Sequence, residues 1–227
     1  MKLQIAVATI GRAPDIARVA AEALAAEVAS ESAHVKRALD AGYTYVALAD
    51  GSVAGFVSNF ITCDGLGGSR FELDLLAVAP GWQGRGIGAR LVGRSMKAAR
   101  LTDARTIRAL VRRDNSPMQR VCARSGLQRS ARAFQLWVSR APQPAGKSAR
   151  DHAARVIAVD TLTYGGYWLE GALSQSAIDA ARSLLRAQPA RSVIGAVVAE
   201  QDRRAIDLLR ANAFVRMGEF DWWSLSL

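Results

Sequence analysis

The sequence is poor in the residues that build disulfide frameworks and metal centres. Its 227 residues include two cysteines, Cys63 and Cys122, and two histidines, His34 and His152. The cysteines are far apart and form no CxxC pair, so we expect neither a disulfide framework nor a zinc site. Two histidines also argue against a His-rich metal centre and a Ser/His/Asp triad. We therefore expect no metal, and the cysteine usage favours a reducing cytoplasm.

Long apolar runs are missing as well. The longest uncharged stretches, such as Gly51 to Cys63, are too short and too polar to span a bilayer. The apolar run from Leu3 to Ile10 is interrupted by Gln4 and is shorter than a secretory signal requires, which favours a first strand. Because the chain is 50% hydrophobic and 22% charged, it can bury a core. We expect a globular protein without a membrane partner.

Acidic residues are scarce in the middle of a basic chain. The net charge is +10, and between Arg85 and Arg155 the acids are Asp103, Asp114 and Asp151. This bias favours an anionic partner, such as a phosphorylated cofactor, RNA or a ribosomal surface. A solvated arginine surface explains the same composition equally well. The charge alone therefore selects no function.

Periodicity and capping residues predict alternating strands and helices. A first helix is expected from Pro14, and Ser30 is expected to cap a second. Further helices are expected after the glycines near 86 and after Asn115 or Ser116. Asp50-Gly51 predicts a hairpin, because both central turn positions favour positive φ. The expected strands are 3–9, 43–49, 52–63, 71–78, 105–112, 127–132 and 134–140.

A Pro- and Gly-rich stretch without periodicity predicts a linker at 141–150. It divides the chain into a domain of residues 1–140 and a second of 151–227. A shift of 87 residues places similar residues of the two parts over one another, which suggests a diverged internal duplication. The matched pairs are Ile107/Ile194, Ala109/Ala196, Val111/Val198, Asn115/Asp202 and Gly126/Ala213, and the spacing of Phe134/Trp137 recurs in Phe220/Trp223.

The segment VAPGWQGRGIGARLV, residues 78–92, places a glycine-rich turn between a strand and a helix. Amides exposed at a helix N-terminus bind anions, and glycines let a phosphate approach closely. A Walker loop would need Lys and a hydroxyl residue after the turn, and Gly88-Ala89-Arg90 supplies neither. The turn also satisfies G-x-G-x-x-A, but no acid ends the following strand as a dinucleotide site requires. An ordinary tight turn is the remaining structural interpretation.

This segment resembles the pyrophosphate loop of the GNAT superfamily of N-acetyltransferases, whose signature is Q/R-x-x-G-x-G/A. Gln83, Gly86 and Gly88 match it, and the preceding Leu-Ala-Val-x-Pro and the order of elements agree as well. The resemblance covers about residues 1–140 and implies an α/β (α+β) fold, a GNAT-like mixed, mostly antiparallel sheet flanked by helices. Residues 151–227 resemble a smaller, degenerate GNAT-like domain without the Q-x-x-G-x-G loop.

The resemblance implies acetyl-CoA as co-substrate, lying between the strand that ends at Val78 and the strand at 105–112. Backbone groups of Leu76, Ala77 and Val78 would hold the pantetheine arm and the thioester carbonyl. The loop would hold the pyrophosphate, and the expected contacts there are Gln83, Gly84, Arg85, Gly86, Ile87, Gly88 and Ala89, with Asn115 nearby on the last helix.

Direct transfer to an amine that arrives as ammonium needs a base. Glu72 and Asp74 alternate on one strand face, and two nearby acids should raise the pKa of one of them. The resemblance favours Glu72, although a carboxylate paired with an arginine is the structural alternative. Family members commonly carry a tyrosine that protonates the thiolate where this chain has Cys122. The identity of the general acid is therefore open, because a buried cysteine more often fills a core than donates a proton.

The sequence thus predicts an N-acetyltransferase that moves an acetyl group from acetyl-CoA to a primary amine by direct attack in a ternary complex. The acceptor is a small molecule or a protein, and the chain is a monomer or a homodimer. A non-catalytic acyl-CoA-binding module is one alternative. An RNA- or ribosome-associated protein that uses the basic surface is another, although nucleic acid is not the expected partner.

Overall fold

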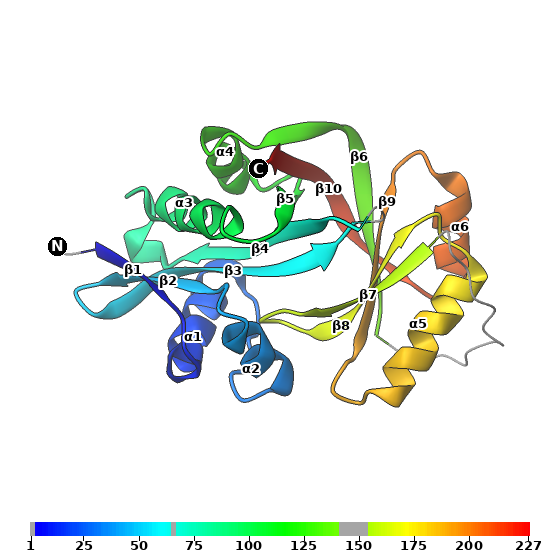
Figure 1. Cartoon of the computed structure of the whole chain (residues 1–227), viewed down its shortest axis with the longest axis horizontal. Coiled ribbons are helices and arrows are strands. Elements are labelled where there is room, and N and C mark those ends of the chain that lie inside the picture. Colours follow the sequence, from blue (N-terminus) through cyan, green and yellow to red (C-terminus); the bar gives the residue numbers. More distant parts are fainter. Residues whose placement is uncertain (1–2, 65–66, 141–153) are drawn as a thin grey trace.

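The computed structural model describes residues 3–64, 67–140 and 154–227 and forms one continuous ten-stranded sheet with helices on its faces (Figure 1). The first half contains β1 (Leu3–Val7), α1 (Ala13–Leu24), α2 (Ala33–Asp40), β2 (Tyr45–Ala49), β3 (Ser52–Cys63), β4 (Ser69–Val78), α3 (Ile87–Ala99), β5 (Ala104–Arg112), α4 (Ser116–Arg124) and β6 (Gln128–Ser139). The second half contains β7 (Ala154–Asp160), β8 (Gly165–Gly171), α5 (Gln175–Ala187), β9 (Val193–Ala199), α6 (Arg203–Ala211) and β10 (Val215–Ser226).

The two halves repeat one arrangement. The strand order is β1-β2-β3-β4-β5-β10-β6-β9-β8-β7. Neighbouring strands are antiparallel, except that β4 runs parallel to β5 and β8 runs parallel to β9. In both halves a helix connects the parallel pair, and a second helix leads to the last strand. The sheet is therefore mixed and mostly antiparallel, as the sequence predicts.

The last strand of each half contributes to the sheet of the other. β10 pairs with β5 of the first half, and β6 pairs with β9 of the second. Trp223 of β10 is 8% exposed in the core beneath α3 and α4, whereas Trp137 of β6 is 4% exposed in the core beneath α5 and α6. The shared Phe-x-x-Trp spacing thus marks two equivalent, exchanged strands. A third core lies between the sheet and helices α1 and α2.

Two local predictions are wrong. Residues 127–132 and 134–140 form one strand, β6, because it pairs on both sides and continues through Ala133 with register shifts. Ser32, not Ser30, caps α2, because the Ser32 Oγ lies 3.4 Å from the Val35 amide that it accepts from. The predicted linker at 141–150 lies outside the described residues, and the division into domains 1–140 and 151–227 stays a prediction.

The Asp50-Gly51 hairpin is confirmed, and the aligned residues Asn115 and Asp202 have the same role in the two halves. Asp50 and Gly51 have φ of +48° and +90°, which suits the two-residue turn. Asp202 caps α6 as Asn115 caps α4.

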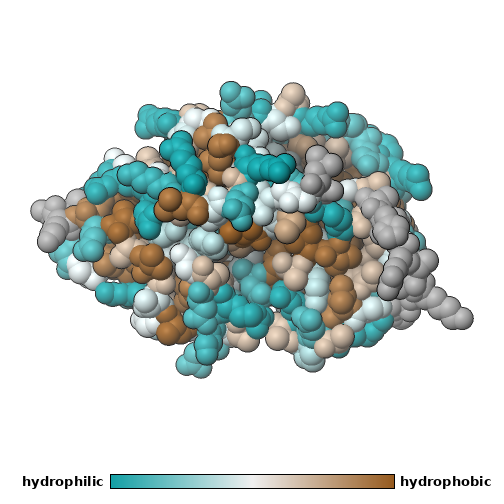
Figure 2. Space-filling model, in the orientation of Figure 1, coloured by the Kyte–Doolittle hydropathy of each residue, from teal (hydrophilic) through white to brown (hydrophobic). Residues whose placement is uncertain are grey.

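On the face shown in Figure 2, hydrophilic side chains cover both halves and surround smaller hydrophobic areas.

Because the halves share strands, we expect the protein to unfold in one cooperative transition. Replacing Trp223 with alanine should lower the free energy of unfolding by about 3–5 kcal/mol through the cavity left behind. Leu101→Ala is the control, since Leu101 is 86% exposed, and its effect should stay below about 0.5 kcal/mol. Urea titration followed by circular dichroism and by tryptophan fluorescence measures both. Two separate transitions, with Trp223→Ala moving one alone, would contradict the shared-strand account.

Candidate active site

The glycine turn joins β4 to α3 through a short 3-10 turn at Pro80–Trp82. Gly84 and Gly86 have φ of +74° and +75°, in the left-handed region that side chains disfavour. No atom lies within 4 Å of the position that a Cβ would take at either glycine. The turn therefore needs glycine for its backbone and not for close packing, and its outer face is open.

The side chains of Gln83 and Ile87 hold the turn against the rest of the domain. Gln83 donates from Nε2 to the carbonyl oxygen of Val78 at 3.0 Å. Ile87 anchors the first turn of α3 in the core at 1% exposure. Gly84, Arg85 and Gly86 are exposed. The amides that begin the 13-residue helix α3 therefore face a free surface, which is the geometry that binds phosphate.

The sheet opens beside this turn. β4 pairs with β5 from Ser69 to Leu73, opposite Ala109, and the two strands are unpaired beyond that point. Asp74 is the extra residue of a bulge, because the β3 partners of Leu73 and Leu75 are consecutive. A bulge bends its strand and ends regular pairing. The edge of β4 that faces β5 therefore has no strand partner from Asp74 to Val78, as the splay predicted for acetyl-CoA requires.

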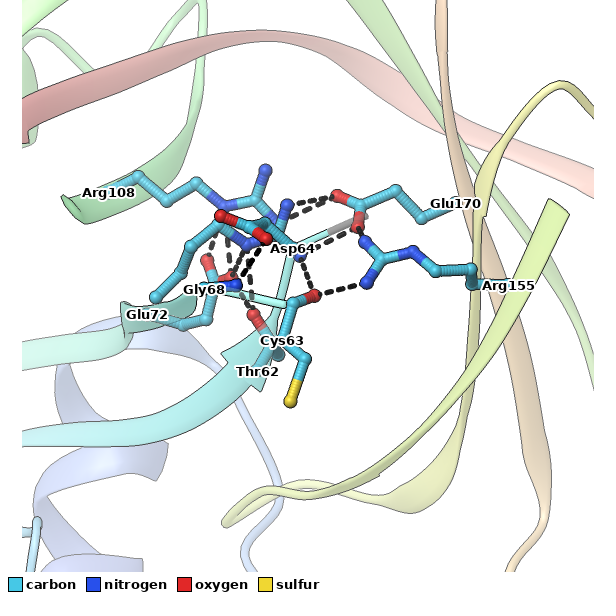
Figure 3. A network of polar contacts seen from close by, with 9 residues as sticks. Thr62, Cys63, Asp64, Gly68, Glu72, Arg108, Arg155 and Glu170 are labelled. Carbon is cyan, nitrogen blue, oxygen red and sulfur yellow. Dashed lines mark hydrogen bonds and ion pairs between the residues drawn. The ribbon is translucent and has the colours of Figure 1, made fainter. Parts of the chain in front are cut away.

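Glu72 lies inside a network of arginines (Figure 3). Its two carboxylate oxygens accept from Nε of Arg108 at 2.9 and 2.8 Å, and Thr62 donates to one of them. Arg70 lies 3.5 Å away. Glu72 is 2% exposed. A carboxylate that is held by two guanidinium groups is poorly placed to accept a proton from a substrate.

The network continues into the second half. Glu170 of β8 accepts from Arg70 at 2.6 and 3.0 Å and from Arg108 at 3.0 Å, and Arg155 of β7 joins it (Figure 3). Burial acts to raise the pKa of Glu170, but hydrogen bonds and charges from Arg70 and Arg108 lower it overall. The halves are thus joined by ion pairs beside the opening of the sheet.

Asp74 has a different environment from Glu72. Its Oδ2 is buried without a hydrogen-bond partner among the described residues. Burial, followed by the negative charge of Glu72, raises the pKa of Asp74 to about 7. A carboxylate with this pKa can take and return a proton at neutral pH. The sequence placed the two acids as neighbours, and the family resemblance favoured Glu72. The ion pair of Glu72 with Arg108 joins two strands and has no local signal in the sequence. The choice between the two acids stays a prediction.

Asn115 and Cys122 serve α4 in the structure. The Asn115 Oδ1 caps the helix by accepting from the Met118 amide at 3.1 Å. Cys122 is 0% exposed in the core of the first half. Burial raises the pKa of its thiol to about 12, so the thiol stays protonated and packed. The proposed roles of Asn115 in cofactor binding and of Cys122 as a proton donor stay predictions.

Two groups near the acids of β4 were not predicted from the sequence. Arg108 stacks its guanidinium 4.0 Å from the centre of the Trp222 ring and binds Glu72. Tyr164 is the second group, and the charge of Asp74 acts on it. Its neighbour Tyr167 lies in the core of the second half, and Trp168 contacts Phe60 across the seam between the halves. The one feature of the sequence that pointed to Tyr164 was the aromatic run from Tyr164 to Trp168.

The corresponding turn of the second half is built differently. Helix α5 begins after Ser174, whose Oγ accepts from the Ala177 amide at 3.3 Å. A side chain therefore occupies an amide of the first turn, where α3 has the bare Gly86. An open amide cradle is thus present at α3 and not at α5.

The described residues contain neither a candidate metal centre nor a candidate membrane-spanning helix. No group of three or more His, Cys, Asp or Glu side chains in 3–64, 67–140 and 154–227 is arranged to hold a metal ion. None of the helices in those ranges has the length and apolar character needed to cross a membrane.

Comparison with known proteins identifies the family. The profile of the acetyltransferase (GNAT) family matches residues 14–127, about half of the chain. No curated protein matches the sequence significantly.

Solved structures share the fold at low identity. A putative acetyltransferase from Pyrococcus horikoshii is 15% identical, with a TM-score of 0.63 over 99% of this chain and 89% of that one. A tandem GNAT protein from the clavulanic acid biosynthesis pathway is 16% identical, with a TM-score of 0.58 over 99% and 98%. A chain of the NatC complex bound to Gag peptide and CoA is 19% identical, with a TM-score of 0.52 over 58% and 88%.

The open glycine turn, the splayed parallel strands and the family match agree with one another. Acetyl-CoA is the co-substrate of this family, and the bare amides at the start of α3 suit its pyrophosphate. The chain belongs to the acetyltransferase (GNAT) family and is an acetyl-CoA-dependent acetyltransferase with two GNAT-like repeats.

Proposed function

We propose that the protein transfers the acetyl group of acetyl-CoA to a primary amine by direct attack in a ternary complex. One observation carries this proposal: the open turn at Gly84 and Gly86 adjoins the unpaired edge of β4, where Asp74 has a pKa of about 7. Binding, carbonyl activation and proton removal are thus available within one short segment.

The amides from Gly84 to Ala89 hold the pyrophosphate, with the dipole of α3 adding partial positive charge. The free edge of β4 from Leu76 to Val78 takes the pantetheine arm and offers an N–H to the thioester carbonyl. A fixed donor stabilises the negative charge that the carbonyl oxygen gains during attack. These residues are among those that the family resemblance implies for the cofactor, together with Gln83 and Asn115.

Asp74 is the base in this proposal. It accepts a proton from the ammonium form of the acceptor, which frees the nitrogen lone pair for attack. The group is suited to this because burial and Glu72 raise its pKa to about 7. Glu72 forms ion pairs with Arg108 and Arg70, and its negative charge helps to raise the pKa of Asp74.

Titration of acetyl-CoA by calorimetry tests the function. We expect one site per chain in the wild type and loss of binding in Gly86→Glu, because a carboxylate at a left-handed position repels the pyrophosphate. Gly93→Ala is the control, since Gly93 lies inside α3 with no atom within 4 Å of a Cβ, and it should bind normally. Release of free thiol is then followed over a panel of an alanine-first peptide, a lysine derivative, spermidine and an aminoglycoside.

Three outcomes separate the alternatives. Binding with turnover supports the proposal. Binding without turnover on any amine favours a non-catalytic acyl-CoA module. No binding in the wild type contradicts the proposal, and steeply salt-dependent RNA binding in that case would favour the basic surface as the functional site.

The base assignment predicts the pH dependence of kcat. At saturating substrates kcat should rise with pH to a plateau, with an apparent pKa of about 7. Asp74→Asn should lower kcat about 10²-fold or more. Glu72→Gln should retain most activity and shift the apparent pKa downward, because the charge that raises it is removed. If Glu72→Gln loses activity and Asp74→Asn keeps the wild-type kcat, Glu72 is the base instead.

Stability provides the control for Asp74→Asn. The folded pKa of Asp74 is raised, so the native state binds more protons than the unfolded state between about pH 4 and pH 7. The wild type therefore loses stability as pH rises through this window. Asp74→Asn should raise the Tm at pH 8 and leave it nearly unchanged at pH 4, which shows that its loss of activity is not unfolding.

A further inference from the structure

The second repeat reaches the opening of the first through the turn between β7 and β8, residues 161–164. Leu162 is 0% exposed and packs with Phe56 and Ala77 in the core beneath α1. The Thr161 amide donates to the Tyr164 carbonyl at 2.9 Å, and the Thr161 Oγ1 accepts from the Tyr164 amide at 3.1 Å. The turn is thus wedged into the first half and held by its own hydrogen bonds.

Contacts across the seam orient the Tyr164 side chain. Trp168 donates from Nε1 to the Tyr164 Oη at 2.8 Å. The Trp168 ring meets Phe60 of β3 edge to face, with centroids 5.2 Å apart, and Phe60 pairs with Glu72 in the sheet. Among the described residues, the Tyr164 oxygen therefore has a donor and no acceptor for its own proton.

Tyr164 lies within electrostatic range of both carboxylates of β4. Burial raises the pKa of Tyr164, and the negative charges of Asp74 and then Glu72 raise it further. The hydroxyl stays protonated in the free enzyme. No hydrogen bond joins the hydroxyl to Asp74 in the described chain.

Resting on the proposed function, we propose that the Tyr164 hydroxyl, supplied by the second repeat, is the general acid that protonates the departing CoA thiolate. Cys122 is enclosed in the core of the first half, and Glu72 is ion-paired with Arg108. Tyr164 is therefore the described hydroxyl that combines burial, a free proton and coupling to Asp74.

The proton transfers balance. Asp74 takes one proton from the ammonium nitrogen, and the nitrogen lone pair forms the C–N bond to the acetyl carbon. The C–S bond then breaks with its electron pair on sulfur, which takes the Tyr164 proton to give the free thiol. The second proton lost by the nitrogen returns to Tyr164, and Asp74 releases its proton to water. Protonated Asp74 is neutral. The negative charge of Asp74 that opposes ionisation of Tyr164 is therefore absent when Tyr164 must give up its proton.

Kinetics of the full chain test this role. Tyr164→Phe should lower kcat 10²- to 10⁴-fold while leaving the calorimetric Kd for acetyl-CoA unchanged. Tyr167→Phe is the matched control, because Tyr167 lies in the second core, 3% exposed, and it should keep wild-type kcat. With the selenoester analogue of acetyl-CoA the deficit of Tyr164→Phe should shrink at least tenfold, since a selenolate leaves without needing a proton.

The outcomes distinguish the two proposals. Wild-type kcat in Tyr164→Phe, with the wild type active, overturns the role of Tyr164 alone. An equal deficit with both donors, or the same deficit in Tyr167→Phe, also overturns it, because a packing defect is indifferent to the leaving group. An inactive wild type that binds no acetyl-CoA overturns the proposed function, and the role of Tyr164 with it.

Discussion

The loss of pairing between β4 and β5 is the constraint on which the site depends. One extra residue, Asp74, ends the parallel ladder after Leu73. Because backbone polar groups at a buried edge need partners, the free edge of β4 is suited to a ligand with amide and carbonyl groups. The same bulge buries a carboxylate without a hydrogen bond and so raises its pKa to about 7. Geometry for binding and acidity for proton transfer thus have one origin.

Strand exchange explains why the second repeat is part of the same unit although its own turn has no open cradle. β10 completes the sheet of the first half, and β6 completes that of the second. Glu170 binds Arg70 and Arg108 across the seam, which leaves Glu72 ion-paired and Asp74 as the unpaired acid. A repeat that has no cradle of its own therefore contributes a carboxylate to the ion-pair network around Glu72.

Local signals in the sequence were sufficient for most of the elements. Glycine positions predicted the turn at Gly86, and Asp50-Gly51 predicted the hairpin, because positive φ is a property of single residues. The exchange of β6 and β10 was not predictable, since either pairing satisfies the same alternation. Alternation alone also did not show that β6 continues through Ala133, so the sequence predicted two strands there. The ion pair between Glu72 and Arg108 joins residues 36 positions apart, and Tyr164 and Asp74, whose charges interact, are 90 positions apart. Periodicity within one segment records neither contact.

The central claim is that acetyl-CoA lies in the opening of the first repeat with its sulfur between Asp74 and the second repeat. A crystal structure of the wild type with acetyl-CoA tests it most directly. The account predicts the pyrophosphate on the amides of residues 84–89, the pantetheine along β4 and the Tyr164 Oη within hydrogen-bond distance of the sulfur. Cofactor density at α5, or a thioester directed away from Asp74 and Tyr164, would contradict it.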